Sequence, residues 1–372
     1  MKRIKILHCI ETISSGGVEV LRLGFARHYN KDRFDLRIVC TNAKGPIKSA
    51  LEKEGIQVYQ VGSFKSPFEI GKYRKVLTVI KEYSPDIIHG AVFEGMCMAS
   101  ICGFLGKVPV IILEETSDPQ IRSLKAIWLQ RQLAKLADLV IGISPSVTQY
   151  LIKKARIPAD KVYLLNNAVD NQNFISKGGN FKREDIGLSG SDYILGSVGR
   201  VHDHVKKYSD IIKAIKILNY SHIKFLLIGD GPDLVYLKGL ALELGIEKQF
   251  ISLGFKEDTA TYYKLMDCFC IPSAQEGFGL VAVEAMFHQL PVIATAVGGL
   301  KDVVQNEVTG ILVPPSDPQS IANSINFLFN NPESSLNMGK EGYLRALKLY
   351  GIGTYTSSLE KLYLTLLTKN VN

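Results

Sequence analysis

The sequence lacks the marks of a membrane-spanning or exported chain. No stretch approaches the roughly 18 uncharged apolar residues that a membrane span needs. The apolar run near the start, Ile4–Ile10, is short and no small-residue cleavage site follows it, so it predicts a first β-strand and not a signal peptide. These absences predict a soluble, cytoplasmic protein that is attached at most to the inner face of a membrane.

The cysteines show no metal-binding or disulfide pattern. There are six, they lie mostly inside apolar runs, and no two form a C-x-x-C pair. Such usage is typical of small buried side chains in a reducing compartment. The glycine-rich first loop, which ends in Gly16-Gly17, also lacks the G-x-G-x-x-G spacing of dinucleotide sites, and this argues against a nicotinamide or flavin cofactor.

What the chain does have is length, apolar content and positive charge. Its 372 residues suit two domains, and 46% apolar with 22% charged residues is a globular composition. The formal net charge of +8 favours anionic partners, such as acidic lipid head groups or phosphorylated small molecules. No nucleic-acid-binding module is visible, so nucleic acid is not an expected partner.

Short β-branched apolar runs alternate with amphipathic helical stretches through both halves, which is the signature of an α/β fold. Near-continuous apolar strands predict parallel sheets covered on both faces. We expect two Rossmann-like, doubly wound domains facing a central cleft, with ligands beyond the carboxyl ends of the strands. The expected boundaries are an N-terminal domain at 1–170, a linker at 171–190, a C-terminal domain at 191–351 and, at 352–372, a closing helix packed back towards the N-terminal domain.

The strongest motif runs from Pro272 to Gly299. A strand ends before it, a loop contains Glu276, and Gly277-Phe278-Gly279 opens a helix that contains Leu280 and Glu284. Glycines at a helix start let a diphosphate approach the backbone N–H groups, where the helix dipole favours anions. Glu284 is placed to accept hydrogen bonds from a ribose diol.

A second motif follows the strand that ends in Gly199-Arg200, with Lys206 six positions after Arg200. Fixed cations after a strand favour an anionic ligand, and they stabilise negative charge that develops on such a ligand in a transition state. Arginine offers a planar fork to two phosphate oxygens and lysine a compact point charge. Lys207 is the alternative to Lys206.

The segment Pro272–Gly299, with two glutamates separated by seven residues, resembles the signature of family 4 of the retaining GT-B glycosyltransferases. The resemblance covers the C-terminal half well and the N-terminal half more loosely. It implies a GT-B fold and transfer of a hexose from a nucleotide diphosphate sugar with retention at the anomeric carbon. UDP is the preferred nucleotide and GDP the next, and the acceptor is implied to bind the N-terminal domain.

The resemblance also implies roles for single residues. The catalytic residues would be Arg200, Lys206 and Glu276. The residues that bind the donor would be Gly16, Gly17, Gly199, Gly229, Phe255, Gly277, Phe278, Gly279, Leu280 and Glu284. No Asp-x-Asp occurs in the chain, so the expected catalysis uses no metal and no cofactor.

The sequence departs from the family pattern at two points. Many members have a histidine after the fifth strand, where this chain has Glu114-Glu115, so these glutamates are candidates for a sugar or acceptor contact. The usual Lys-Gly is Lys206-Lys207 here. Two other functions stay open: a nucleotide-sugar epimerase of the same fold, and a sugar-nucleotide sensor without turnover.

The acceptor is expected to be a lipid-linked or glycan intermediate of bacterial surface polysaccharide synthesis. Two basic amphipathic stretches, Phe64–Lys81 and Gln120–Leu136, favour peripheral contact with an anionic membrane, and the second contains the only tryptophan, Trp128. Ordinary surface helices packed on a sheet would give the same pattern.

Overall fold

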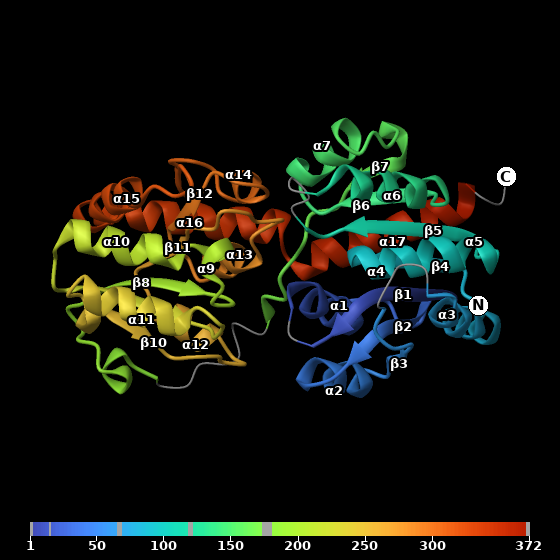
Figure 1. Cartoon of the computed structure of the whole chain (residues 1–372), viewed down its shortest axis with the longest axis horizontal. Helices are drawn as coiled ribbons and strands as arrows, with labels where there is room; N and C mark the ends of the chain where they lie inside the picture. The colour runs from blue at the N-terminus through green and yellow to red at the C-terminus, as the bar shows by residue number, and fades with distance from the viewer. Residues whose placement is uncertain (1–2, 15, 65–68, 118–121, 173–180, 370–372) are drawn as a thin grey trace. The chain divides into compact units, whose positions relative to one another are not determined.

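The structure is a computed structural model that describes residues 3–14, 16–64, 69–117, 122–172 and 181–369 (Figure 1). Its chain divides into two compact units, and each is described by itself. Unit 1 comprises Met1–Val169 and Ile352–Asn372, and unit 2 comprises Asp170–Gly351.

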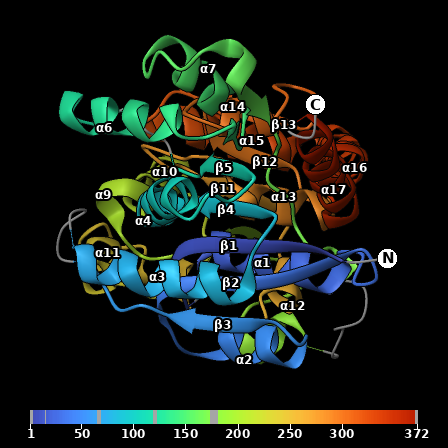
Figure 2. The ribbon, with the colours of Figure 1, turned by 90° about the vertical axis from the view of Figure 1, so that its right-hand side faces the viewer.

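Unit 1 is built on a seven-stranded sheet whose strands pair in parallel, in the order β3-β2-β1-β4-β5-β6-β7. Figure 2 shows the first five of these strands from bottom to top, with α4 and α17 on opposite faces. The strands are β1 (Ile4–Ile13), β2 (Phe34–Ala43), β3 (Gln57–Gln60), β4 (Ile87–Ala91), β5 (Val110–Glu115), β6 (Leu139–Gly142) and β7 (Val162–Leu164).

The helices of unit 1 connect and cover these strands. They are α1 (Gly17–His28), α2 (Pro46–Lys53), α3 (Ile70–Tyr83), α4 (Val92–Cys97), a π-helical turn (Met98–Cys102), α5 (Gly103–Leu105), α6 (Leu124–Lys135), α7 (Pro145–Lys153), a 3₁₀ turn (Ala159–Lys161) and α17 (Ile352–Lys369). α17 contributes Tyr355, Leu359 and Tyr363 to the same apolar core as the central strands. The end of the chain therefore completes the first unit.

Unit 2 has a six-stranded parallel sheet in the order β10-β9-β8-β11-β12-β13. Its strands are β8 (Tyr193–Val198), β9 (Ile223–Ile228), β10 (Phe250–Ser252), β11 (Cys268–Ile271), β12 (Val292–Thr295) and β13 (Gly310–Val313). Its helices are η4 (Arg183–Ile186), α9 (Asp203–Lys206), α10 (Tyr208–Leu218), α11 (Leu234–Glu243), η5 (Glu247–Gln249), α12 (Ala260–Tyr263), α13 (Leu280–Phe287), α14 (Leu300–Val303), α15 (Pro318–Asn330) and α16 (Pro332–Leu349).

The direction in which successive strands are added reverses between β8 and β11. In open α/β sheets such a reversal leaves a crevice at the carboxyl ends of the two strands, since their connections leave to opposite sides. The predicted motifs follow these two strands. The fold therefore brings Arg200 and Glu276 to one edge of the sheet although 76 positions separate them.

The expectation of two doubly wound α/β units is confirmed, and all six cysteines are buried and free. The predicted linker at 171–190 falls partly on residues 173–180, which lie outside the described residues. The second half of the predicted linker contains η4. Arg183 of η4 forms an ion pair with Asp267 in the rest of unit 2, at 2.9 Å between Nη2 and Oδ1. That part of the predicted linker is a folded segment of unit 2.

Candidate active site

Two loops of unit 2 meet at the carboxyl ends of β8 and β11. The backbone N–H of Ala274, after β11, donates to the carbonyl of Val205 in α9 at 2.8 Å. Lys206 Nζ lies 2.7 Å from Glu276 Oε2, and Ser273 Oγ donates to the same oxygen at 3.4 Å. Both charged side chains are mostly buried, with 23% of Lys206 and 17% of Glu276 exposed. The two predicted catalytic motifs therefore form one cluster.

Of the two candidate lysines, it is Lys206 that reaches this cluster. Lys207 follows α9 in the left-handed region, at φ 53° and ψ 36°, and separates α9 from α10. A residue with a Cβ is strained in this region, whereas glycine is not. Lys207 stands at the glycine of the family's Lys-Gly pattern, and this is the position where the backbone adopts the left-handed conformation.

Arg200 begins the loop after β8. Its side chain is exposed, and no hydrogen bond or ion pair engages its guanidinium within the part of the chain that the structure describes. An exposed guanidinium without a protein partner keeps its donors available for an anion such as a diphosphate.

The helix α13 begins at a backbone position that requires glycine. Gly279, its N-cap, has φ 99°, and a Cβ there would lie 2.5 Å from Leu300 Cδ2. Gly277 precedes it, and Leu280 is the first helical residue. The Phe278 ring is only 3% exposed and packs edge-on against Tyr350 at 5.4 Å. Phe278 therefore anchors the loop to the core, which leaves backbone groups as the part of this segment that can meet a donor.

Glu284 lies one helical turn into α13, half-buried. Tyr263 donates from its hydroxyl to Glu284 Oε2 at 2.8 Å. Burial raises the pKa of Glu284 to about 7, although the hydrogen bond from Tyr263 acts in the opposite direction. Sequence reasoning missed Tyr263, because no spacing connects it to the glutamate pair.

The turns after β8, β9 and β10 pack against one another. Gly229 N donates to Gly254 O at 2.9 Å, and a Cβ on Gly229 would lie 1.9 Å from Gly199 O. Only glycine permits this approach. Phe255, next to Gly254, is 61% exposed. An exposed ring at this edge is available to stack on a base, and the role of Phe255 in donor binding stays a prediction.

The predicted donor loop of unit 1 has acidic surroundings. Gly16 is the N-cap of α1 and Gly17 its first residue, with Glu19 in the first turn. Glu19 accepts from Thr12 Oγ1 at 3.2 Å, and burial together with Glu94 and Glu19 raises the pKa of Glu11. A carboxylate already complements the dipole of α1, and the role of Gly16 and Gly17 in donor binding stays a prediction.

Glu114 is enclosed in the core of unit 1. Its Oε2 lies 2.6 Å from Arg22 Nη2 and 3.0 Å from His89 Nε2, and Glu114 and Arg22 are each about 1% exposed. Burial alone would raise the pKa of Glu114, but Arg22 and His89 outweigh it and lower that pKa to about 2. One oxygen of this buried carboxylate, Oε2, is thus already paired inside unit 1, and the role of Glu114 in a sugar or acceptor contact stays a prediction.

Glu115 is also about 1% exposed and is bonded inside unit 1. It pairs with Arg122 and accepts from Gln130 Nε2 at 2.7 Å and from Ser117 Oγ at 2.7 Å. Both Glu114 and Glu115 therefore already have protein partners, and the predicted contact of either one with a sugar or an acceptor stays a prediction.

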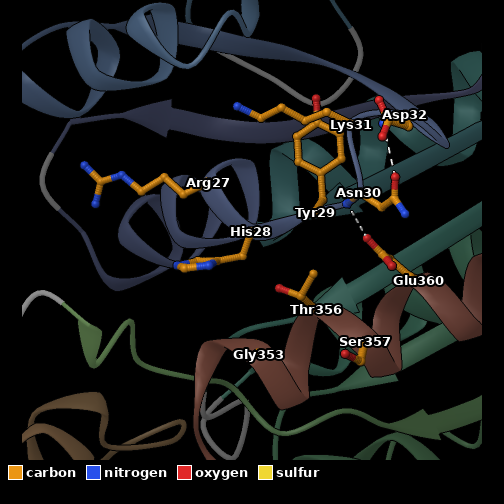
Figure 3. A pocket seen from close by; sticks show the side chains of 10 residues that line it. All are labelled: Arg27, His28, Tyr29, Asn30, Lys31, Asp32, Gly353, Thr356, Ser357 and Glu360. Atoms are coloured by element: carbon orange, nitrogen blue, oxygen red, sulfur yellow. Dashed lines mark hydrogen bonds between the residues drawn. The ribbon is translucent and has the colours of Figure 1, made fainter.

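An open pocket of about 640 Å³ lies elsewhere on unit 1, between the end of α1 and the start of α17 (Figure 3). Glu360 closes one side by accepting from Asn30 N at 2.7 Å. Its lining contains none of the predicted site residues and consists of Arg27, His28, Tyr29, Asn30, Lys31, Asp32, Gly353, Thr356, Ser357 and Glu360.

The described residues contain neither a cluster of side chains that could hold a metal ion nor a membrane-spanning helix. They contain no group of three or more His, Cys, Asp or Glu side chains arranged to hold a metal ion. Within the same residues, no helix combines the length and the apolar character that crossing a bilayer requires.

Comparison with known families gives two adjoining matches. Residues 15–173 match the model described as Glycosyltransferase Family 4, and residues 180–345 match Glycosyl transferases group 1. Together the two matches extend over most of the chain.

Relatives and solved structures agree with these matches. The chain is 26% identical to an N-acetyl-alpha-D-glucosaminyl L-malate synthase of Bacillus anthracis, over 82% of this chain and 81% of the relative. It is 25% identical to a UDP-Gal:alpha-D-GlcNAc-diphosphoundecaprenol alpha-1,3-galactosyltransferase of Escherichia coli, over 87% of each. The structure of HepE from Anabaena in complex with UDP superposes with a TM-score of 0.86 at 23% identity, over 97% of this chain and 100% of HepE.

Proposed function

The chain belongs to the family 4 glycosyltransferases of the GT-B fold, and from this premise we propose that it transfers a hexose from a UDP-sugar to an acceptor with retention of configuration. The observation that carries the proposal is the cluster of Lys206 and Glu276, beside a loop whose Arg200 has no partner among the described residues. Glycosyl transfer needs cations at this position, since the leaving diphosphate gains charge as the bond breaks.

The choice of UDP rests on relatives. The E. coli relative is named for a UDP-galactose donor, and HepE was solved with UDP and with UDP-glucose. In unit 2, the exposed ring of Phe255 is available to stack on the base and Glu284 to accept from the ribose hydroxyls. GDP is the alternative nucleotide.

The proposed mechanism needs no protein nucleophile. Arg200 and Lys206 stabilise the diphosphate as it leaves, while Glu276 accepts from sugar hydroxyls. Lys206 Nζ is paired with Glu276 Oε2. A bound diphosphate competes for that ammonium group, so donor binding frees Glu276 for the sugar. The acceptor hydroxyl then attacks from the face that the diphosphate leaves, through an oxocarbenium-like state. Its oxygen bonds to the anomeric carbon as the bond from that carbon to the diphosphate oxygen breaks, its proton passes to that diphosphate oxygen, and the configuration is retained.

We further propose that the reaction uses no metal and no cofactor, because cationic side chains and the start of α13 supply the charge that a metal would supply. The test is donor hydrolysis, which needs no knowledge of the acceptor. The protein is incubated with a panel of UDP- and GDP-sugars in EDTA, and proton NMR follows the first sugar released. Early release of the α-anomer supports the proposal.

Other outcomes would contradict it. Early release of the β-anomer means inversion, and a requirement for added metal removes the metal-independent mechanism. Conversion of the donor to an epimer without transfer identifies an epimerase. Binding of the donor without any cleavage, even with a broad set of acceptors, identifies a sensor.

We propose a lipid-linked or glycan acceptor of bacterial surface polysaccharide synthesis, reached at the cytoplasmic face of the membrane. The E. coli relative is named for a diphosphoundecaprenol-linked acceptor. On α6, Leu124 is 85% and Trp128 is 60% exposed, with exposed Lys125 beside them. Exposed aromatic and aliphatic side chains with a flanking cation are the pattern of an interfacial helix.

The basic face of α6 is smaller than the sequence suggested. Arg122 pairs with Glu115, and Arg131 Nε donates to Ala155 O at 2.7 Å. The predicted stretches also include residues 65–68 and 120–121, which lie outside the described residues. The proposed contact is therefore limited to the exposed part of α6.

Sedimentation with vesicles of phosphatidylglycerol and phosphatidylcholine tests this contact. We expect salt-sensitive binding that Trp128→Ala weakens. Tyr236→Ala is the control, because Tyr236 is 53% exposed on α11 in unit 2. Absence of binding, or equal loss in both variants, would remove the membrane contact without touching the proposed reaction.

A further inference from the structure

Glu284 is held by an aromatic pair that none of the predicted motifs contains. Tyr263 is fully buried, and its hydroxyl donates to Glu284 Oε2 at 2.8 Å. The ring of His288 stacks on the ring of Tyr263, with centroids 4.8 Å apart and planes 18° from parallel. His288 lies one turn after Glu284 on α13, and its Nδ1 is 2.8 Å from Glu284 O. Because a carbonyl oxygen only accepts, Nδ1 is the donor of this bond.

These contacts fix both ends of the interaction. Tyr263 is enclosed by Phe269, whose ring centroid is 5.6 Å away, on one strand of the sheet, and by His288 on α13. The phenol thus has little freedom to turn from the carboxylate. One carboxylate oxygen of Glu284 receives the phenol proton, and the described residues offer no partner for Oε1. The second oxygen is left for a ligand.

We propose that Tyr263, braced by His288, is a positioning residue that holds the Glu284 carboxylate as the acceptor for the ribose hydroxyls of the donor nucleotide. This inference rests on the proposed function, since it assumes that Glu284 meets the ribose. It adds to that function a residue outside the glutamate motif and a dependence of nucleotide binding on pH.

The pH dependence follows from the protonation state of Glu284. A carboxylate accepts from two hydroxyls, whereas a protonated carboxyl loses part of that capacity. Ribose hydroxyls therefore favour the ionised form, and binding should weaken as pH falls through the pKa of about 7. The bond from Tyr263 stabilises the ionised form, so removing it raises this pKa and moves the loss of affinity to higher pH.

Other titratable or charged groups on the elements around α13 include His288, Arg345 of α16, Lys301 and Asp302 of α14, and the buried thiols of Cys268 and Cys270 on β11. Burial lowers the pKa of His288, with Lys264 and Asp258 as smaller and opposing influences, so this ring is neutral across the pH range of interest. From α16, Arg345 donates to the carbonyls of Val303 and Asp302. β11 and β12 have no charged side chains. Within the described residues, Tyr263 is the one side chain bonded to the Glu284 carboxyl.

The test is calorimetric titration with UDP and GDP between pH 6.5 and 8.5. If Tyr263 is worth about one pKa unit, Tyr263→Phe weakens binding about threefold at pH 7.5 and approaches tenfold at pH 6.5. The same titrations with the 2′,3′-dideoxy nucleotide should show no difference between the variant and wild type. If the role of Tyr263 were merely structural, Tyr263→Phe would weaken the binding of the ribonucleotide and of the dideoxynucleotide alike. Tyr193→Phe, which removes another tyrosine hydroxyl from unit 2, is the control.

The outcomes separate this inference from the proposed function. If wild type binds neither nucleotide, or Glu284→Gln changes nothing, the proposed function fails. If Glu284→Gln weakens binding but Tyr263→Phe does not, or weakens ribo- and dideoxynucleotide equally, only this inference fails. Should Tyr263→Phe not fold, wild type alone decides: its preference for the ribonucleotide over the dideoxy form must shrink as pH falls below 7, and a constant preference would overturn the inference.

Discussion

Arg200 and Lys206 are two cations that follow the same strand, yet among the described residues only Lys206 has a carboxylate partner. The two therefore have separate roles in the proposed reaction. Lys206 would exchange Glu276 for the diphosphate, while Arg200 has no partner among the described residues to give up. A guanidinium that stays unpaired until the donor arrives contributes its full interaction to the charge that develops on the leaving group.

We predict that Arg200→Ala lowers kcat for donor cleavage by about 100-fold to 1000-fold, the usual effect of losing one charge-stabilising donor. The kcat of Arg200→Lys should lie between those of Arg200→Ala and wild type, because lysine keeps the positive charge but lacks the planar guanidinium that binds two oxygens. Steady-state kinetics in EDTA measures both. Lys238→Ala, which removes an exposed cation from α11, is the matched control. A kcat within twofold of wild type for Arg200→Ala would contradict the assignment.

A second prediction at the residue scale concerns the effect of Lys207 on stability. Its left-handed backbone, at φ 53°, costs a residue with a Cβ about 1–2 kcal/mol, and glycine avoids most of this cost. The greater freedom of glycine in the unfolded chain offsets part of the gain. We expect Lys207→Gly to raise the free energy of unfolding of unit 2 by about 0.5–1 kcal/mol in urea titrations. Lys213→Gly, inside α10, should lower it by about 1 kcal/mol. A loss of stability in Lys207→Gly would refute the strain argument.

Single residues also mark what the sequence could not predict. The spacing of Glu276 and Glu284 is local, so the sequence could identify both as site candidates. Glu114 was placed near the sugar because the family pattern has a histidine there. Its partner Arg22 is 92 positions away on another element, and no local pattern connects the two. The surroundings of Glu114 thus depend on a long-range ion pair that the sequence does not reveal.

Among elements, the loop before α13 is held by its neighbour after β12. Gly299 N donates to Glu276 O at 3.0 Å, and a Cβ on Gly299 would lie 2.5 Å from Gly277 O. The backbone angles of Gly299 suit any residue, so close approach alone requires glycine here. The segment after β12 therefore acts as a support for the donor loop.

We predict that Gly299→Ala displaces this loop, destabilises unit 2 by about 1–3 kcal/mol and weakens nucleotide binding at least tenfold. Gly239→Ala is the matched control, since a Cβ there meets nothing within 4 Å in α11. That control should be as stable as wild type or slightly more stable. Thermal unfolding and nucleotide titration together measure the effect, and unchanged binding in Gly299→Ala would show that the contact does not support the loop.

Sequence reasoning located regular elements well and irregular ones poorly. From residue 70 on, the predicted amphipathic stretch Phe64–Lys81 forms α3 (Ile70–Tyr83), because its apolar residues recur with helical spacing. The segment 92–105 was not predicted, although it forms α4, a π-helical turn and α5. It is apolar on nearly every side, so no period distinguishes helix from strand. β7, at three residues, is too short to leave a pattern.

At the scale of the whole molecule, the core of unit 1 contains two buried histidines that make its stability depend on pH. In unit 1, Tyr363 OH lies 2.9 Å from His8 Nε2 and 2.8 Å from His89 Nδ1, and His89 Nε2 faces Glu114. With both histidines neutral, one arrangement fits these contacts: His8 donates to Tyr363, Tyr363 donates to His89 Nδ1, and the Nε2–H of His89 faces Glu114. It requires both histidines to be neutral, and burial lowers the pKa of each.

The sign of the pH effect follows directly. The unfolded chain binds protons at His8 and His89 near their usual pKa of about 6.5, while the folded chain does not. Stability is therefore greatest well above the usual histidine pKa of about 6.5 and falls as pH falls through it, because the unfolded chain takes up protons that the folded chain does not. Glu114, with a pKa of about 2, adds its own loss only below pH 4.5.

Unfolding of unit 1 can be followed by fluorescence, because Trp128 is the only tryptophan of the chain. We expect its transition to move to lower urea between pH 7 and 5.5. The double variant His8→Gln/His89→Gln should be less stable at pH 7 and lose less over the same range. A wild-type transition that does not move with pH would contradict the neutral-histidine arrangement.

The most direct test of the central claim is calorimetric titration of the whole chain with UDP and GDP in EDTA, for wild type, Arg200→Ala and Glu284→Ala. The account predicts metal-independent binding of one nucleotide, weakened by both substitutions, with Lys238→Ala unchanged. Binding of neither nucleotide, or binding that is indifferent to both substitutions, would contradict the assignment of the donor site to unit 2.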